Sequence, residues 1–268
     1  MTGMPIKMSY SFKDVAIPDD FLKTDPPDAE PITFKQIDFR NSVLKEFAGC
    51  YAVVLDHVLS PSECAQLLEL AEASVSDGNR NKVTGSPWAR ALVNAGGGYE
   101  VEVPDYRNSD RIIWDQQEIM KRLWARLVQV PQISETLLQA PGGWEFNRVN
   151  ERMRFLKYGP GEFFRPHCDS AYSEVSDDGH AYMSHYTLHL YLNDSKQEVG
   201  DEAQLVGGAT SFLSSNQQRK MDVDPKAGRV LIFQHRRLYH SGDDVREGIK
   251  YTMRTDIMYR QPGAQFFS

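Results

Sequence analysis

The segment HYTLHLYLND, residues 185–194, decides the fold class of this chain. Apolar side chains occupy every second position, which is the pattern of a strand with one buried face. We expect helices to cover the face that carries the leucines. The opposite face, which we expect to point into the interior of the fold, carries Thr187, His189 and Tyr191.

The surrounding sequence extends this β pattern from about residue 144 to residue 260. Short apolar runs are separated there by Gly, Pro, Asp and Asn turns, which favours an antiparallel sandwich or barrel. Helical patterns come earlier, between about residues 60 and 140. We therefore predict one mainly β domain with flanking helices over residues 49–262. An extended N-terminal arm, rich in Pro, Asp and Lys, precedes it over residues 1–48.

Three segments of the helical half have clear local patterns. Ser60, Pro61 and Glu63 form the sequence of a capping box, so a helix should begin there. A second helical region is predicted over residues 116–138. The polar, glycine-rich stretch 76–111 predicts a long surface loop without secondary structure, which could contact a substrate.

The composition excludes several classes of protein. The 268 residues are 41% hydrophobic and 25% charged, as in folded globular chains, and no apolar run is long enough to span a membrane. A net charge of -7 disfavours binding to nucleic-acid backbones. The three cysteines are widely separated, and the first residues lack the apolar core of a secretory signal. We therefore expect a cytoplasmic protein without disulfides.

The motif His-Cys-Asp at residues 167–169 is the first candidate for metal binding. In a strand, His167 and Asp169 would lie on one face, about 7 Å apart at the backbone, and a metal ion could sit between them. Cys168 would point the other way, and we expect it to be a small buried hydrophobic residue.

A third ligand is available further along the chain. His240 follows a buried type of strand at residues 230–233, and two histidines with one carboxylate form the facial triad of non-haem Fe(II) oxygenases. The same ligands could equally hold zinc in a hydrolase. His235, in the polar run Gln-His-Arg-Arg, is expected to be a surface or turn residue.

The segment KYTMRTDIMY, residues 250–259, favours the iron enzyme. Alternation places Lys250 on the same face as Arg254 and Asp256. A cation that projects into a barrel is costly unless it meets an anion, and the far carboxylate of 2-oxoglutarate would supply one. Arg254 lies about 13 Å further along the strand. We expect it either to pair with Asp256 or to reach a different oxygen of the cofactor.

Four motifs occur in a specific order: H-C-D at 167–169, G-G-A-T at 207–210, P-K-A-G-R-V-L-I-F at 225–233, and H-x4-V-x2-G-x-K-Y at 240–251. Together they resemble the prolyl 4-hydroxylase-like branch of the Fe(II)/2-oxoglutarate-dependent dioxygenases. The resemblance covers roughly residues 50–260. It implies a double-stranded β-helix, the cupin-like jelly roll, flanked by helices.

The resemblance also implies roles for individual residues. His167, Asp169 and His240 resemble the iron ligands and are the predicted catalytic residues. Lys250 resembles the residue that binds the distal carboxylate of 2-oxoglutarate, and two pocket tyrosines of the family have counterparts here. The predicted contacts to the cofactor are Lys250, Tyr191, Tyr158 and Arg254.

The activity expected from these features is the oxidation, by default the hydroxylation, of an unactivated C–H bond. The expected cofactors are Fe(II), 2-oxoglutarate and O2, with ascorbate as a reductant, and the products of the co-substrate are succinate and CO2. The substrate is a small metabolite, an amino acid or a peptide, and the oligomeric state stays open. A zinc-dependent hydrolase and a non-catalytic jelly-roll binding module are the alternatives, and the complete triad with Lys250 disfavours the binding module.

Overall fold

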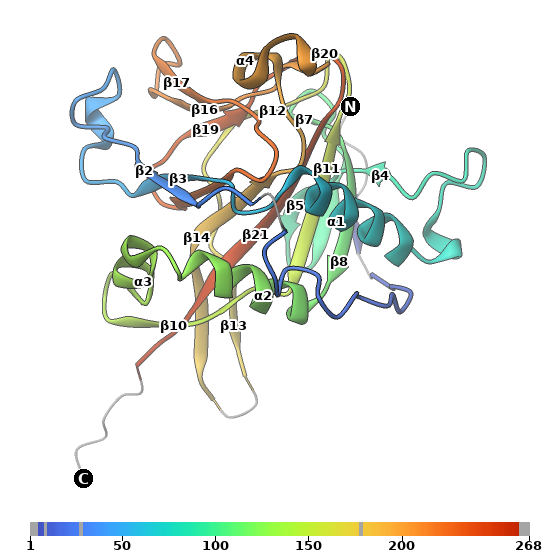
Figure 1. Cartoon of the computed structure of the whole chain (residues 1–268), viewed down its shortest axis with the longest axis horizontal. Helices are drawn as coiled ribbons and strands as arrows, with labels where there is room; N and C mark the ends of the chain where they lie inside the picture. The colour runs from blue at the N-terminus through green and yellow to red at the C-terminus, as the bar shows by residue number, and fades with distance from the viewer. Residues whose placement is uncertain (1–4, 8–9, 27–28, 177–178, 263–268) are drawn as a thin grey trace.

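The structure is a computed structural model that describes residues 5–7, 10–26, 29–176 and 179–262 (Figure 1). Two antiparallel β-sheets form its centre, and helices α1, α2 and α3 lie outside the larger sheet. This is the mainly β jelly roll with flanking helices that the sequence predicts.

The larger sheet contains both alternating segments of the sequence, HYTLHLYLND at residues 185–194 and KYTMRTDIMY at residues 250–259. Its strands, in spatial order, are β2 (Thr33–Gln36), β3 (Ala52–Asp56), β18 (Val230–Gln234), β14 (Ala181–Tyr191), β21 (Lys250–Arg260), β11 (Arg152–Tyr158), β8 (Asp110–Asp115) and β4 (Ala89–Arg90). Three further strands join it at the side, β9 (Gln139–Ala140), β10 (Trp144–Val149) and β13 (Ser173–Val175). The central strands β14 and β21 pair along most of their length, from Tyr182 opposite Arg260 to Tyr191 opposite Thr252.

The smaller sheet faces the larger one across the interior of the jelly roll. Its strands, in spatial order, are β17 (Lys220–Val223), β16 (Thr210–Leu213), β19 (His240–Gly242), β12 (Phe163–His167) and β7 (Arg107–Asn108). A separate two-stranded pair is formed by β15 (Val206–Gly207) and β20 (Val245–Glu247).

The helices cover the leucine face of β14, as expected from the alternation. The side chains of Leu188 and Leu190 are completely buried in the main hydrophobic core, together with residues of α1 (Pro61–Ser74) and α2 (Gln117–Leu127). Burial of each such leucine contributes about 1.5–3 kcal/mol to folding. The core therefore fixes which face of β14 points into the jelly roll, because a shift of one residue would exchange the two faces.

The predicted start of α1 is confirmed. The Ser60 side chain accepts a hydrogen bond from the Glu63 backbone N–H, and the Glu63 carboxylate accepts one from the Ser60 backbone N–H. The second helical region is interrupted by Pro131, which begins α3 (Pro131–Leu137), so it forms two helices. The remaining helices are short: α4 (Lys196–Val199), and the 3-10 helices η1 (Lys45–Phe47), η2 (Asp77–Asn79) and η3 (Gly200–Glu202).

The described parts of the N-terminal arm pack against the body of the protein. Strand β2 pairs with β3 at one edge of the larger sheet, and Phe21 and Leu22 are buried in the main core. The Arg122 guanidinium of α2 donates hydrogen bonds to the backbone carbonyls of Pro18 and Phe21. The division of the chain at residue 48 stays a prediction.

The expectation of a structureless loop over residues 76–111 is wrong. This stretch contains η2, β4, β7 and the start of β8, and a three-stranded sheet joins β1 (Ile6–Lys7), β6 (Tyr99–Val101) and β5 (Val93–Gly96). Gly96, Gly97 and Gly98 have positive φ angles and make the tight turn between β5 and β6. The glycines therefore serve a hairpin turn, which composition alone does not distinguish from a loop.

Candidate metal centre

Two histidines and one aspartate meet in the interior of the jelly roll. Among the described residues, His167, Asp169 and His240 form the one group of potential metal ligands, and their ligand atoms lie within 4.8 Å of one another. Pairing of β12 with β19 places the two histidines directly opposite each other. Strand β12 ends at His167, so Asp169 reaches the group from the irregular segment that follows and not by strand alternation.

The backbone orients both imidazoles toward the aspartate. His167 Nδ1 lies 2.8 Å from the Arg165 carbonyl oxygen, and His240 Nδ1 lies 3.0 Å from that of Leu238. Each Nδ1 therefore carries the proton, and each Nε2 presents its lone pair to the space beside Asp169, at 3.7 Å from a carboxylate oxygen. Such outer hydrogen bonds are typical of metal-binding histidines.

Electrostatics keep these three groups in the protonation states that a metal needs. Burial and the neighbouring His240 lower the pKa of His167 to about 3, and burial also lowers the pKa of His240. Burial alone would raise the pKa of Asp169, but Arg254 and the two imidazoles lower it well below its usual range. The site thus offers two neutral imidazoles and a carboxylate at neutral pH.

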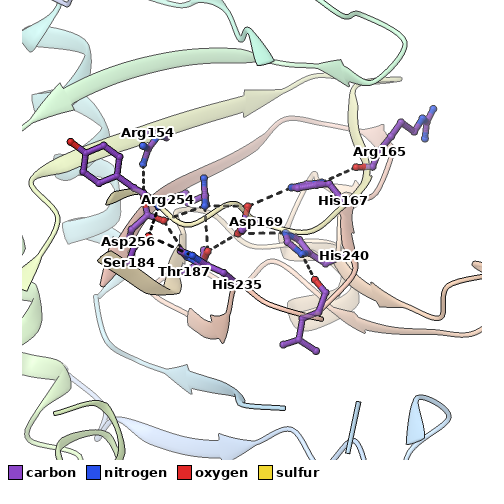
Figure 2. A network of polar contacts seen from close by, with 12 residues as sticks. Arg154, Arg165, His167, Asp169, Ser184, Thr187, His235, His240, Arg254 and Asp256 are labelled. Carbon is purple, nitrogen blue, oxygen red and sulfur yellow. Dashed lines mark hydrogen bonds and ion pairs between the residues drawn. The ribbon is translucent and has the colours of Figure 1, made fainter. Parts of the chain in front are cut away.

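The carboxylate of Asp169 is held from behind by strands of the larger sheet (Figure 2). The Thr187 hydroxyl of β14 donates a hydrogen bond to Asp169 Oδ2 at 2.5 Å, and Arg254 Nη2 of β21 lies 3.1 Å from Oδ1. Arg254 Nη2 also lies 3.2 Å from Asp256 Oδ1, and Arg154 pairs with the other oxygen of Asp256 at 3.1 Å. The predicted pairing of Arg254 with Asp256 is therefore present, and Arg254 contacts Asp169 as well.

His235 extends this network, and the expectation that it lies at the surface is wrong. Its side chain is 2% exposed, and its Nε2 lies 3.5 Å from Asp256 Oδ1 (Figure 2). The polar run around His235 suggested a turn, whereas Gln234 ends β18 and the His235 N–H donates to the His185 carbonyl of the neighbouring strand. This burial comes from contacts distant in sequence, which the local pattern does not reveal.

The exposure of Cys168 also differs from the prediction. It is exposed, because it lies beyond the last residue of β12, where the alternation of buried and exposed faces no longer applies. The prediction that Cys168 is a small buried hydrophobic residue is therefore wrong.

Lys250 lines the same pocket as the triad, and its charge has no counter-ion among the described residues. The side chain is 2% exposed, and no carboxylate of the described residues lies within ion-pair distance. Its Nζ lies over the rings of Tyr158 and Tyr191, at 5.2 and 5.8 Å from their centroids. Burial lowers the pKa of Lys250 to about 8. A buried ammonium group without a counter-ion suits a ligand that brings a carboxylate.

The two predicted tyrosines occupy different places. Tyr158 lines the pocket with the triad and Lys250, whereas Tyr191 lies behind Lys250 with its hydroxyl 3.4 Å from the Val223 carbonyl oxygen. His189, two residues before Tyr191 on β14, lines the pocket, and its buried Nε2 has no hydrogen-bond partner. The buried Thr252 hydroxyl, on the same face of β21 as Lys250, also lacks one. Unsatisfied buried polar atoms near Lys250 fit a polar ligand at this end.

Sequence reasoning assigned no role to several residues of this pocket. Arg107, Arg154 and Phe164 received no predicted role, because pairing between strands distant in sequence brings each of them to the pocket. The full lining consists of Arg107, Arg154, Leu156, Tyr158, Phe164, His167, Asp169, Thr187, His189, Thr210, Phe233, His240, Ser241, Gly242, Lys250 and Arg254.

A larger cavity, of about 930 Å³, lies elsewhere, between the N-terminal segment and the ends of α1 and α2. Its buried charges are already paired, since Arg126 holds both carboxylate oxygens of Glu63 at 2.9 and 2.7 Å. The smaller pocket with the triad is therefore the better candidate for chemistry.

The donor set and its surroundings fit a non-haem iron site. Two histidines and one carboxylate would leave positions of an octahedral metal open, and the buried cation of Lys250 lines the same pocket. The fold and the pocket together define a jelly-roll metalloenzyme.

Part of the chain matches a known family. Residues 153–255, which include the triad and Lys250, match the model of the 2OG-Fe(II) oxygenase superfamily. The superfamily uses Fe(II), 2-oxoglutarate and O2, so the protein is an Fe(II)- and 2-oxoglutarate-dependent dioxygenase. No curated protein matches the sequence.

Solved structures of prolyl hydroxylases are similar to this fold. A prolyl hydroxylase from Trichoplax adhaerens, in complex with a peptide fragment of the hypoxia inducible factor oxygen degradation domain, has a TM-score of 0.51 at 16% identity and covers 83% of this chain and 88% of its own. A prolyl-4-hydroxylase from Pseudomonas putida has a TM-score of 0.49 at 16% identity, covering 80% and 96%. The collagen prolyl hydroxylase of Paramecium bursaria Chlorella virus-1 has a TM-score of 0.47 at 19% identity, covering 78% and 97%.

The helices of the described residues give no sign of a membrane segment, since none is both long and apolar enough to cross a bilayer.

Proposed function

We propose that this dioxygenase hydroxylates an unactivated C–H bond of a small metabolite, an amino acid or a peptide. The observation that carries the proposal is the meeting of the His167, Asp169 and His240 ligand atoms, within 4.8 Å, in one pocket with the unpaired Lys250. When bound, the Fe(II) centre supplies O2 activation coupled to conversion of 2-oxoglutarate to succinate and CO2.

In this proposal the protein residues hold the reactants in register. His167, His240 and Asp169 are the metal ligands, and the Arg165 and Leu238 carbonyls fix the two imidazoles. Correct placement of reacting groups accounts for a large part of the rate of such enzymes.

Lys250 binds the distal carboxylate of 2-oxoglutarate in the proposed complex. The ring of Tyr158 bounds this end of the pocket, while Tyr191 supports Lys250 from behind. The two unpartnered groups nearby, His189 Nε2 and the Thr252 hydroxyl, offer further hydrogen bonds to the co-substrate.

The role of Arg254 differs from that of Lys250. Its guanidinium contacts Asp169 and Asp256, which favours orientation of the ligand carboxylate, while its buried Nε has no partner. Contact of Arg254 with the cofactor, as the sequence analysis predicts, would use this Nε.

The alternative functions have no independent support. The match of residues 153–255 to the oxygenase model favours neither a zinc hydrolase nor a non-catalytic binding module. The choice of hydroxylation over desaturation, ring formation or epimerisation, the use of ascorbate and a cytoplasmic location remain predictions.

An anaerobic titration tests the proposed cofactor site. Fe(II)-loaded protein should develop the weak visible charge-transfer band of the iron chelate when 2-oxoglutarate is added. The band should be lost in His240→Ala and should need much more 2-oxoglutarate in Lys250→Ala. A wild-type protein that shows no band under any condition would overturn the proposal.

A further inference from the structure

The side chain of Arg107 is a second cation of the pocket without a protein counter-ion. It projects from β7 at the edge of the smaller sheet and lines the pocket with the triad. None of the described carboxylates lies within ion-pair distance of its guanidinium. Its Nη1 donates to the Leu92 carbonyl at 3.2 Å, and its buried Nε has no hydrogen-bond partner.

The position of Arg107 places it close to the candidate metal centre. The guanidinium carbon lies 4.7 Å from the centroid of the Phe164 ring, and that ring stacks on His167 with 3.8 Å between centroids. Only one aromatic ring therefore separates Arg107 from a metal ligand. Burial lowers the pKa of Arg107 to about 10, because its charge is taken from water and not compensated.

The charges around the pocket do not balance without a further anion. Four cations line it, Arg107, Arg154, Lys250 and Arg254, against the single carboxylate of Asp169, and Asp256 behind the wall adds a second. Fe(II) and the dianion of 2-oxoglutarate cancel each other. The formal charge then stays at +4 - 2 = +2.

Most of these cations already have partners. Arg254 and Arg154 contact Asp256, Arg254 contacts Asp169, and Lys250 is the residue proposed for 2-oxoglutarate. Glu100, a carboxylate that favours the charged form of Arg107, is held by Arg111. Arg107 is thus the cation left for a ligand other than the co-substrate.

We propose that Arg107 binds a carboxylate of the substrate itself, so that the enzyme acts on a small molecule that carries a free carboxylate, such as a free amino acid. This inference rests on the proposed function and narrows its substrate class. A planar guanidinium matches a carboxylate well, because its N–H groups can donate two parallel hydrogen bonds to the two oxygens. The backbone of a peptide bound through its interior would place no charge beside Arg107.

The test compares matched acids and amides on the loaded enzyme. Protein with Fe(II) and 2-oxoglutarate is titrated without O2 with the protein L-amino acids, each as the free acid and as the α-carboxamide. Binding is followed by the change in the charge-transfer band and by calorimetry. With O2 admitted, succinate formation is measured for the same pairs.

We expect at least one free acid to bind about tenfold or more tightly than its amide, which is the usual size of a lost charge-assisted hydrogen bond. Arg107→Gln should remove this preference and Arg107→Lys should keep part of it. Arg260→Gln should leave it unchanged, because Arg260 is exposed at the end of β21, pairs with Glu145 and does not line the pocket.

The 2-oxoglutarate band separates the possible outcomes. If the band forms but no free acid binds at millimolar concentration, if acids and amides bind alike, or if Arg107→Gln binds the acid as tightly as the wild type, the carboxylate inference is wrong. A band of normal intensity in Arg107→Gln shows that the variant is folded. Absence of the band in the wild type instead overturns the proposed function.

Discussion

The two ends of the pocket differ in how their charges are balanced. At the metal end, Asp169 receives the Thr187 hydroxyl and the Arg254 guanidinium, and backbone carbonyls fix both histidines. At the other end, Lys250 Nζ lies over two aromatic rings, and no carboxylate of the described residues pairs with it. The protein itself thus fixes the geometry of the metal end, whereas the Lys250 end needs a ligand to complete it.

The largest effect is expected where the protein supplies the ligands. His240→Ala removes one of the three proposed metal ligands. Loss of a group that only supports a ligand typically lowers metal affinity 10–100-fold, so loss of the ligand itself should lower it by about 100-fold or more. Metal content after dialysis and succinate formation measure it. Exchange of His180, which does not line the pocket, for alanine is the matched control. An active His240→Ala enzyme would show that this histidine is not a required metal ligand.

The next effect concerns the end that needs a ligand. Lys250→Ala should raise the concentration of 2-oxoglutarate needed for half saturation by about 10–100-fold, as expected for a lost bond to a charged group, with metal affinity unchanged. Lys250→Arg should recover part of it. If Lys250→Ala weakens metal binding as much as 2-oxoglutarate binding, the two ends of the pocket do not bind their ligands independently.

A smaller effect tests the support behind the metal ligand. Thr187→Val removes the hydroxyl that donates to Asp169 and should weaken metal binding by about tenfold. Thr187→Ser should bind metal normally. Thr252→Val is a matched control on the neighbouring strand, since the Thr252 hydroxyl has no partner, and its metal affinity should equal that of the wild type.

The strands that line the pocket were predictable because their periodicity is local. The leucines of β14 and the alternating polar residues of β21 show the inward face directly. The partners of these residues were less accessible. His235 and Arg154 reach Asp256 from other strands, and the order of strands in the sheet is not contained in any one segment.

The errors near the metal centre have a related cause. Alternation was applied to Cys168 and Asp169, but β12 ends at His167, so an irregular segment and not the strand positions them. The convergence of His167, Asp169 and His240 was nevertheless predicted, because the resemblance transfers positions whatever the local conformation. The hairpin of β5 and β6 was missed because a glycine-rich turn has the composition of a loop.

The smallest predicted effect is a pH dependence confined to the Lys250 end. Because burial lowers the pKa of Lys250 to about 8, the ammonium is charged below that pH and loses its charge above it. Binding of 2-oxoglutarate should therefore weaken as pH rises, by about threefold between pH 7.5 and pH 8.5 for a single titrating group. Anaerobic titration of the charge-transfer band at each pH measures this. Lys250→Arg should show no such change, because arginine stays charged throughout. A wild-type affinity that is constant over this range would mean that the ligand-free pocket already keeps Lys250 protonated, and the two ends would then differ less than their contacts indicate.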